Sequence, residues 1–246
     1  MKILIVSGFL GAGKTTFIKR LARNVDQRFA ILENEYGAAG IDGARLGQNR
    51  QGTQKNVWEM TEQCICCIGK KDFAASVLTI ANVVDPEYLI VEPTGVGSLA
   101  RIIENLRQIE YERIQLLSPV TIVDVYSYRR YMAEYPELYQ DQIRSADTII
   151  VSKTEACQAE EKQRIQKFLQ EINSQAKIIT DYASTMTRED YQSLLLGGRY
   201  EKEVQDTQSG EKMPETFSFE NIRMEAPETL WCFLEQIIRG AFGNII

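Results

Sequence analysis

The chain of 246 residues contains no histidine. Histidine is both the commonest general base and the commonest metal ligand in proteins. Any transition-metal site in this chain must therefore be built from thiolates and carboxylates, and any general base must be a different kind of side chain.

Long hydrophobic runs and an excess of positive charge are also missing. No stretch of about 18 apolar residues occurs, so no segment is expected to cross a membrane. The net charge of −6 argues against a nucleic-acid partner, which usually requires a basic face. The short apolar run at the N-terminus enters a glycine-rich loop and has no small-residue cleavage site. We therefore expect no signal peptide and a cytoplasmic location.

Cysteine is scarce, yet three of the five cysteines, Cys64, Cys66 and Cys67, lie within four residues. An odd total in such a chain does not indicate a disulfide framework. Clustered thiolates select Zn²⁺ or Cu(I), and a tetrahedral zinc would need a fourth ligand from elsewhere. Metal or redox use of the cluster and a purely structural role both stay open. Cys157 and Cys232 lie in helical patterns and are expected to be packing residues.

Short β-rich runs alternate with helical patterns along the chain. Six runs read as strands buried on both faces: 2–7, 28–33, 87–92, 119–124, 147–152 and 176–181. Six patterns read as helices: 14–24, 72–83, 98–109, 136–145, 158–173 and 187–196. This alternation predicts an α/β fold, a doubly wound and mostly parallel sheet of the P-loop nucleotidase type.

The composition changes near residue 199. We expect a nucleotide-binding domain over 1–198 and a polar linker or exposed loop over 199–215. Residues 216–246 read as the start of an incomplete C-terminal domain, with an alternating strand followed by an amphipathic helix. Pro227 marks the start of that helix and Gly240 follows its end.

The strongest motif is the glycine-rich run that begins at Gly8, which matches G-x-x-x-x-G-K-[ST] between a strand and a helix. Its glycines let successive N–H groups face phosphates at a helix N-terminus. We expect Lys14 to reach the β- and γ-phosphates and the Thr15 hydroxyl to ligate Mg²⁺. The predicted phosphate-binding residues are Gly8, Gly11, Ala12, Gly13, Lys14, Thr15 and Thr16.

A second motif, Glu92-Pro-Thr-Gly95, ends an apolar strand. Glu92 is expected to hold a Mg²⁺-bound water. The Gly95 N–H is expected to donate to the γ-phosphate, so that loss of this phosphate on hydrolysis releases the loop. Lys14, Glu92 and Gly95 are the predicted catalytic group. Glu35, with its neighbours at the end of the second strand, could orient the attacking water or help hold a metal.

A third motif, Ser152-Lys153-Thr154-Glu155, stands where GTPases carry Asn-Lys-x-Asp. A carboxylate there accepts hydrogen bonds from guanine and would repel the N1 acceptor of adenine, while the lysine stem covers the base. Lys153 and Glu155 are therefore the predicted base-binding residues. Serine in place of asparagine is expected to lose part of the hydrogen bonding that fixes the loop.

Together these motifs resemble the CobW-like branch of the CobW/HypB/UreG family of P-loop GTPases. The resemblance runs in family order over about residues 1–180 and rests on GFLGAGKTTF, ENEYG, IDG at 41–43, CICC, EPTG, VDV at 123–125, QIRSADTIIVSKTE and IN at 172–173. It departs from the family in Ser152, in Glu155, in Gln63 where a glycine usually stands, and in the missing histidine-rich stretch.

The resemblance implies a GTP-binding metallochaperone or metalloenzyme activator that uses Mg²⁺ and handles zinc, cobalt or nickel. It implies a metal role for Cys64, Cys66 and Cys67, with Glu35 as a further candidate ligand, a client metalloenzyme as partner, and room for a homodimer. Without a histidine base, intrinsic turnover is expected to be slow. The alternative is a nucleotide-dependent activator of a corrinoid or other cofactor enzyme in which the cysteines are structural or redox-active.

Overall fold

The computed structural model of the protein describes residues 1–27, 29–33, 57–61, 70–204 and 226–239. The chain divides into two units, Met1–Pro214 and Glu215–Ile246, and each is described by itself. The first unit carries the sheet and the second carries one helix.

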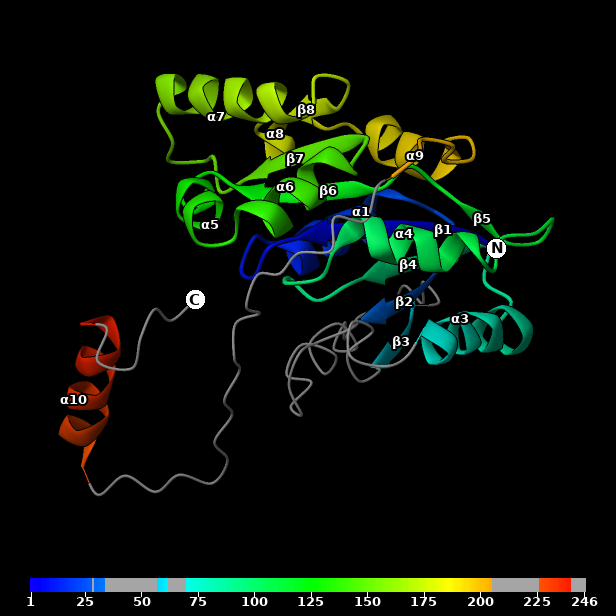
Figure 1. The fold of residues 1–246 in the computed structure, drawn as a ribbon, viewed down its shortest axis with the longest axis horizontal. Helices are drawn as coiled ribbons and strands as arrows, with labels where there is room; N and C mark the ends of the chain where they lie inside the picture. Colours follow the sequence, from blue (N-terminus) through cyan, green and yellow to red (C-terminus); the bar gives the residue numbers. More distant parts are fainter. Residues whose placement is uncertain (28, 34–56, 62–69, 205–225, 240–246) are drawn as a thin grey trace. The chain divides into compact units, whose positions relative to one another are not determined.

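The first unit is built on an eight-stranded sheet in which every pairing between described strands is parallel (Figure 1). Along the sheet the strands follow the order β3-β2-β4-β1-β6-β7-β8, and the short β5 also pairs with β1. The bounds are β1 Lys2–Gly8, β2 Phe29–Glu33, β3 Val57–Thr61, β4 Tyr88–Glu92, β5 Gln115–Leu116, β6 Val120–Asp124, β7 Thr148–Ser152 and β8 Lys177–Ile179. The predicted fold class is confirmed.

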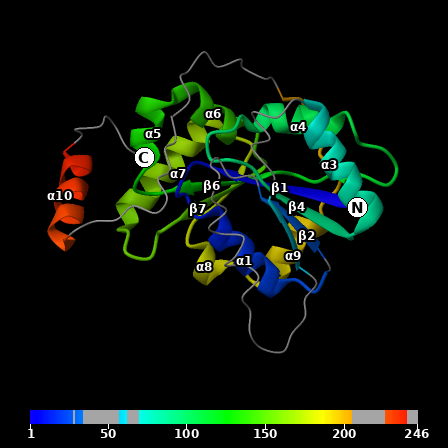
Figure 2. The ribbon, with the colours of Figure 1, turned by 90° about the horizontal axis from the view of Figure 1, so that it is seen from below.

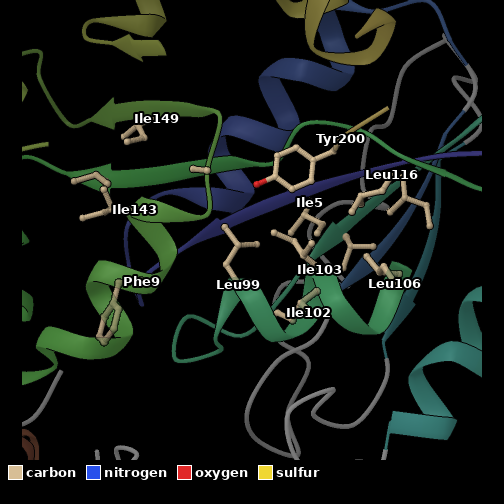
Figure 3. Packing of buried hydrophobic residues seen from close by; sticks show 14 of the residues in the cluster. Ile5, Phe9, Leu99, Ile102, Ile103, Leu106, Leu116, Ile143, Ile149 and Tyr200 are labelled. Atoms are coloured by element: carbon tan, nitrogen blue, oxygen red, sulfur yellow. The ribbon is translucent and has the colours of Figure 1, made fainter. Parts of the chain in front are cut away.

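The strands are apolar on both faces because each face has its own hydrophobic core. Along β1, Ile3 and Ile5 belong to one buried cluster, whereas Leu4 and Val6 belong to the other. This alternation follows the two-residue period of a strand. Figure 3 shows the first cluster, in which side chains of β1 and α4 pack against Leu116 and Tyr200.

Helices cover the two faces (Figure 2). The first cluster is closed by α3 (Lys70–Val83), α4 (Leu99–Arg107), α5 (Tyr128–Glu134), α6 (Pro136–Arg144) and α7 (Ala159–Ile172). The second is closed by α1 (Lys14–Asn24), α8 (Tyr182–Thr185) and α9 (Arg188–Leu196). The helix starts are set locally: the Ser98 side chain caps α4, and Thr187 with Asp190 forms a capping box on α9.

All six predicted strands and all six predicted helices are present, with ends that agree to within about two residues. Sequence analysis missed β3, β5, α5 and α8. The strand β3 stands at the end of the strand order and carries a glutamate and a threonine, so it lacks the continuous apolar run of a central strand.

Residues at the start of the predicted linker are part of the first unit. The Tyr200 N–H donates to the Leu116 carbonyl at 2.8 Å, and the Tyr200 hydroxyl donates to the Ser145 carbonyl at 3.0 Å. The linker and domain bounds otherwise stay predictions, because residues 205–225 lie outside the described part of the chain.

The second unit contains α10 (Pro227–Ile238), which begins at Pro227 as predicted. The strand expected before it lies outside the described residues. Cys232 is exposed, so its predicted packing role is wrong, whereas Cys157 packs against the first hydrophobic cluster. None of the helices in the described ranges has the length and hydropathy that crossing a bilayer requires.

Candidate functional site

The topology of the sheet places the site at the carboxyl ends of its central strands. The chain builds β2, β3 and β4 on one side of β1 and then crosses to β6, β7 and β8 on the other. Open α/β sheets bind ligands outside the carboxyl ends of the strands at such a reversal of strand order. The residues that end the strands there include Gly8, Glu33, Glu92, Asp124 and Ser152.

The loop after β1 has the backbone of a phosphate cradle. Gly8, Gly11 and Gly13 have φ values of 144°, 68° and 99°, which glycine adopts at little cost. A Cβ on Gly8 would also lie 2.4 Å from the Ile122 carbonyl oxygen, so a larger residue would clash with β6. The loop leads directly into α1, whose first N–H groups complete an anion-binding end.

Two side chains of α1 point to the ligand end of the sheet. The Lys14 ammonium is buried and donates to the carbonyls of Gly8 at 3.0 Å and Phe9 at 3.3 Å. The Thr15 hydroxyl donates to the two Glu92 carboxylate oxygens at 3.0 and 3.3 Å. The fold thus brings together two residues that are 77 positions apart in sequence. Two hard oxygen donors beside a phosphate loop fit Mg²⁺.

The segment after Glu92 lies directly on the phosphate loop. A Cβ added to Gly95 would come within 2.5 Å of the Leu10 backbone nitrogen, so only glycine allows this approach. The carbonyls of Gly95 and Gly97 both accept hydrogen bonds from the buried Gln142 side chain, at 3.0 Å each. Sequence analysis noted Gln142 only as the first residue of the segment QIRSADTIIVSKTE and assigned it no role.

Aromatic residues of α5 and α6 fix the phosphate loop from the side. The Phe9 ring lies 4.2 Å from the Tyr131 ring and 5.8 Å from the Tyr139 ring, measured between centroids. The Tyr131 hydroxyl donates to the Leu10 carbonyl at 3.1 Å. Burial raises the pKa of both tyrosines, which keeps their hydroxyls protonated. These contacts fix the phosphate loop against α5 and α6.

The predicted base-binding loop is tied to the phosphate loop. The Ser152 hydroxyl is buried and donates to the Ala12 carbonyl at 2.6 Å. Ser152 therefore supplies a hydrogen bond that fixes the loop. Lys153 has a left-handed backbone, with φ 59°, and Glu155 is exposed at the mouth of the loop.

Asp124 is a site residue that sequence analysis noted only as part of the VDV motif. It ends β6 and is 5% exposed. Its carboxylate accepts from the Lys153 ammonium at 2.7 Å, from the Ser127 hydroxyl at 2.9 Å and from the Tyr126 N–H at 2.9 Å. An acid at the end of an apolar strand was the signal that identified Glu92, and it applies equally to Asp124.

Asp181 is a second residue that the sequence did not reveal. It follows β8 and accepts from the Lys162 ammonium at 2.6 Å. Hydrogen bonds from the Lys162 and Thr154 side chains lower the pKa of Asp181. Since Thr154 lies between Lys153 and Glu155, Asp181 anchors the predicted base-binding loop from the neighbouring turn.

The predicted transition-metal residues Cys64, Cys66, Cys67 and Glu35 lie outside the described residues. Within the described ranges, no group of three or more Cys, Asp and Glu side chains is placed to hold a metal ion. The metal assignment therefore stays a prediction.

Comparison with known proteins identifies the family to which this site belongs. Residues 2–180 match the family described as "CobW/HypB/UreG, nucleotide-binding domain". The zinc chaperone YeiR of Escherichia coli is 30% identical over 178 residues, which are 71% of this chain and 53% of that protein. The zinc chaperone CobW of Pseudomonas aeruginosa is 27% identical over 209 residues, 73% of this chain and 56% of that protein. The chain thus spans about half the length of these relatives.

Solved structures share the fold at lower identity. The Zn(II)-bound YjiA GTPase from E. coli superposes with a TM-score of 0.55 at 19% identity, covering 82% of this chain and 66% of that one. The hydrogenase maturation factor HypB from Archaeoglobus fulgidus superposes with the same TM-score at 16% identity, covering 80% and 89%. The matched region contains the phosphate loop, Glu92, Gly95 and the predicted base-binding loop, and the chain therefore belongs to the CobW-like CobW/HypB/UreG family of P-loop GTPases.

Proposed function

We propose that this protein binds Mg²⁺·GTP, hydrolyses it slowly to GDP and phosphate, and uses the two nucleotide states to control delivery of zinc to a client metalloprotein. The observation that carries the nucleotide half is the contact of the Thr15 hydroxyl with the Glu92 carboxylate, next to the buried Lys14 ammonium. A ligand phosphate in the loop would replace the carbonyl oxygens that Lys14 now contacts.

The chain's own residues divide the work of hydrolysis. The loop N–H groups bind the β-phosphate, and the Lys14 charge stabilises the negative charge that develops on the γ-phosphate. When bound, Mg²⁺ would be held by Thr15 and, through a water, by Glu92, and it would neutralise phosphate charge. The Gly95 N–H would donate to the γ-phosphate, which the close approach of Gly95 to Leu10 of the phosphate loop supports.

Attack by water then breaks the bond between the γ-phosphorus and its bridging oxygen and releases phosphate. The chain has no histidine to act as base, so orientation of the water falls to a carboxylate or to the backbone. Glu33 is one candidate, because it pairs in register with Glu92 at the strand ends. Such a site supports the slow turnover of a switch GTPase.

Base choice is assigned to Lys153 and Glu155. The Lys153 ammonium is fixed by Asp124, which leaves its carbon stem to cover the face of the base. The exposed Glu155 carboxylate would accept from the two guanine donors. Thr16, at the start of α1, would contact the α-phosphate side of the nucleotide.

The metal half of the proposal rests on sequence and on relatives. The relatives YeiR and CobW reported above are named zinc chaperones, and another, from Dictyostelium discoideum, is named a zinc-regulated GTPase metalloprotein activator. We assign zinc to the thiolates of Cys64, Cys66 and Cys67, with Glu35 as a further candidate ligand. Cobalt and nickel are the alternative metals. The same proposal includes two partners: a client metalloenzyme that receives the metal, and a second copy of this chain that forms a homodimer across the nucleotide face.

The nucleotide half is tested by GTP turnover in Lys14→Ala, with Lys19→Ala on the same helix as the matched control. We expect Lys14→Ala to reduce kcat by at least about a hundredfold, as loss of a transition-state charge contact does, without loss of helical signal in circular dichroism. The control should keep its turnover. Near-normal turnover in a folded Lys14→Ala protein would overturn the assignment of the phosphate loop.

The metal half is tested by zinc titration with GTP or GDP present. Thiolates bind zinc only after losing protons, so affinity should rise with pH through the thiol range. Cys66→Ser with Cys67→Ser should abolish tight zinc binding and any effect of zinc on GTP affinity, and the two effects must match because linkage is reciprocal. Cys157→Ser is the control. Unchanged zinc affinity in the double variant would favour the alternative function with structural or redox cysteines.

A further inference from the structure

Gln142 of α6 is a buried polar side chain outside the predicted nucleotide site. It is 1% exposed, and its amide nitrogen donates to the Gly95 and Gly97 carbonyls at 3.0 Å each. Its own backbone carbonyl accepts from the Thr121 hydroxyl of β6 at 2.9 Å. Gln142 therefore connects the segment after Glu92 to a helix that is itself tied to the sheet.

The orientation of the Gln142 amide follows from its neighbours. With the nitrogen toward Gly95 and Gly97, both protons of the NH₂ group have an acceptor. The opposite orientation would set the amide oxygen against two carbonyl oxygens with no proton between them. Among the described residues the amide oxygen of Gln142 has no hydrogen-bond partner. The orientation that satisfies the two carbonyls therefore leaves this oxygen without a donor. A buried acceptor without a partner destabilises the folded state.

The carbonyls that Gln142 holds belong to the stretch that lies on the phosphate loop. Gly95 lies so close to the Leu10 backbone that a Cβ would overlap it. The Gly97 N–H donates to the Thr94 carbonyl at 3.0 Å, which closes a turn around Gly95. Fixing the Gly95 carbonyl limits rotation about a residue that otherwise has the greatest backbone freedom.

The residue before Gln142 acts on the next part of the same segment. The Asp141 carboxylate accepts from the Leu99 N–H at 2.7 Å and from the Ala100 N–H at 3.4 Å, at the N-terminus of α4. Two successive residues of α6 thus hold the segment 95–100 at both of its ends.

We infer that Gln142 is a positioning residue for the GTPase reaction: it holds Gly95 on the phosphate loop, where the Gly95 N–H distinguishes GTP from GDP. This inference rests on the proposed function. It adds that α6 sets how strongly the protein responds to the γ-phosphate. Because the Gln142 amide donates to the carbonyls of Gly95 and Gly97, it acts through Gly95 and not on the nucleotide.

The test compares Gln142→Met with Gln140→Met, a substitution on the same helix at a partly exposed glutamine that accepts from Arg144. Methionine matches the length of glutamine and removes the donor without adding charge. We expect Gln142→Met to lower the preference for a non-hydrolysable GTP analogue over GDP by about tenfold and to lower kcat by a similar factor. Its GDP affinity should stay within about twofold, because the loop contacts to the β-phosphate remain. The control should match the wild type in all three measurements.

A purely structural role predicts another result. Reduced thermal stability with an unchanged GTP-to-GDP preference and unchanged kcat would overturn the inference. If the methionine variant does not fold, Gln142→Asn replaces it, because its amide is one methylene shorter and no longer reaches both carbonyls. The same loss of GTP-to-GDP preference is expected for Gln142→Asn. Failure of both to fold would also overturn it, since Gln142 would then serve the core. A wild type that neither binds nor hydrolyses GTP would overturn the proposed function itself, whereas normal wild-type activity with an unaffected variant overturns only the role of Gln142.

Discussion

Ser152 shows how one small side chain can link two loops of a nucleotide site. Its hydroxyl reaches the Ala12 carbonyl across 140 positions of sequence and is buried. A neutral hydrogen bond of this kind contributes about 1 kcal/mol, enough to bias the loop toward one arrangement. Ser152 thus ties the stretch that carries Lys153 and Glu155 to the loop after β1.

Glu155 is the residue on which base choice should depend. We predict that the wild type binds GTP at least about tenfold more tightly than ATP, about 1.4 kcal/mol, because a carboxylate accepts from two guanine donors and repels the adenine acceptor. Glu155→Gln should remove most of this preference, since an amide offers both a donor and an acceptor. Calorimetric Kd values for both nucleotides provide the measurement.

The matched control for Glu155 is Glu160→Gln, the same change at an exposed position in the first turn of α7. It should leave the ratio of the two Kd values unchanged. Equal affinity of the wild type for GTP and ATP would show that the Ser-Lys-Thr-Glu loop does not select the base.

At the scale of elements, the turn after β8 is held to α7 and to the loop after β7. Asp181 adopts a left-handed backbone with φ 55°, a conformation that Asp and Asn tolerate better than other residues. It accepts from Lys162 of α7, and both side chains of this pair are about three-quarters buried, at 25% and 28% exposure. Asp181→Asn therefore removes the charge without adding backbone strain.

We predict that Asp181→Asn lowers the free energy of unfolding by about 1 kcal/mol near neutral pH, the upper range for a partly exposed ion pair. The Lys162 and Thr154 hydrogen bonds depress the pKa of the folded-state carboxyl. Stability from this group is therefore complete above the unfolded-state pKa of about 3.9 and is lost as pH falls through the lower folded-state pKa.

Urea denaturation across acidic to neutral pH tests this sign. The difference between wild type and Asp181→Asn should shrink as pH falls through that window. Asp26→Asn is the control, because Asp26 pairs with Arg188 on the surface with both side chains more than half exposed, and it should change stability little at any pH. A difference for Asp181 that grows on acidification would contradict the assignment.

At the scale of the molecule, the described nucleotide-site residues all fall in the unit Met1–Pro214. The family match, over residues 2–180, lies in the same unit. We predict that a chain ending at Pro214 binds GTP with a Kd within about threefold of the full chain. Isothermal titration of both proteins measures this, and Lys14→Ala in the shortened chain is the control that should not bind. Loss of binding in a folded shortened protein would show that residues 215–246 contribute to the site.

The sequence by itself determined the parts of this protein that local patterns encode. Apolar runs predicted the central strands because strands buried on both faces leave no alternation, and β1 and β4 were found at the predicted places. The glycine spacing predicted the phosphate loop because positive φ values and close approach both require glycine. Edge strand β3 and the short helices α5 and α8 escaped prediction, since a few mixed residues carry too little periodicity.

Only the tertiary structure decided which distant residues support the site. Gln142 meets Gly95 across 47 positions, and Asp124 meets Lys153 across 29. Asp181 meets Thr154 of the predicted base-binding loop through a turn that the sequence does not distinguish from others. Each of these contacts depends on the strand order and on the packing of helices over the sheet. A local pattern reports the backbone that a segment prefers, whereas a buried hydrogen-bond partner is chosen by the three-dimensional neighbours that folding brings to it.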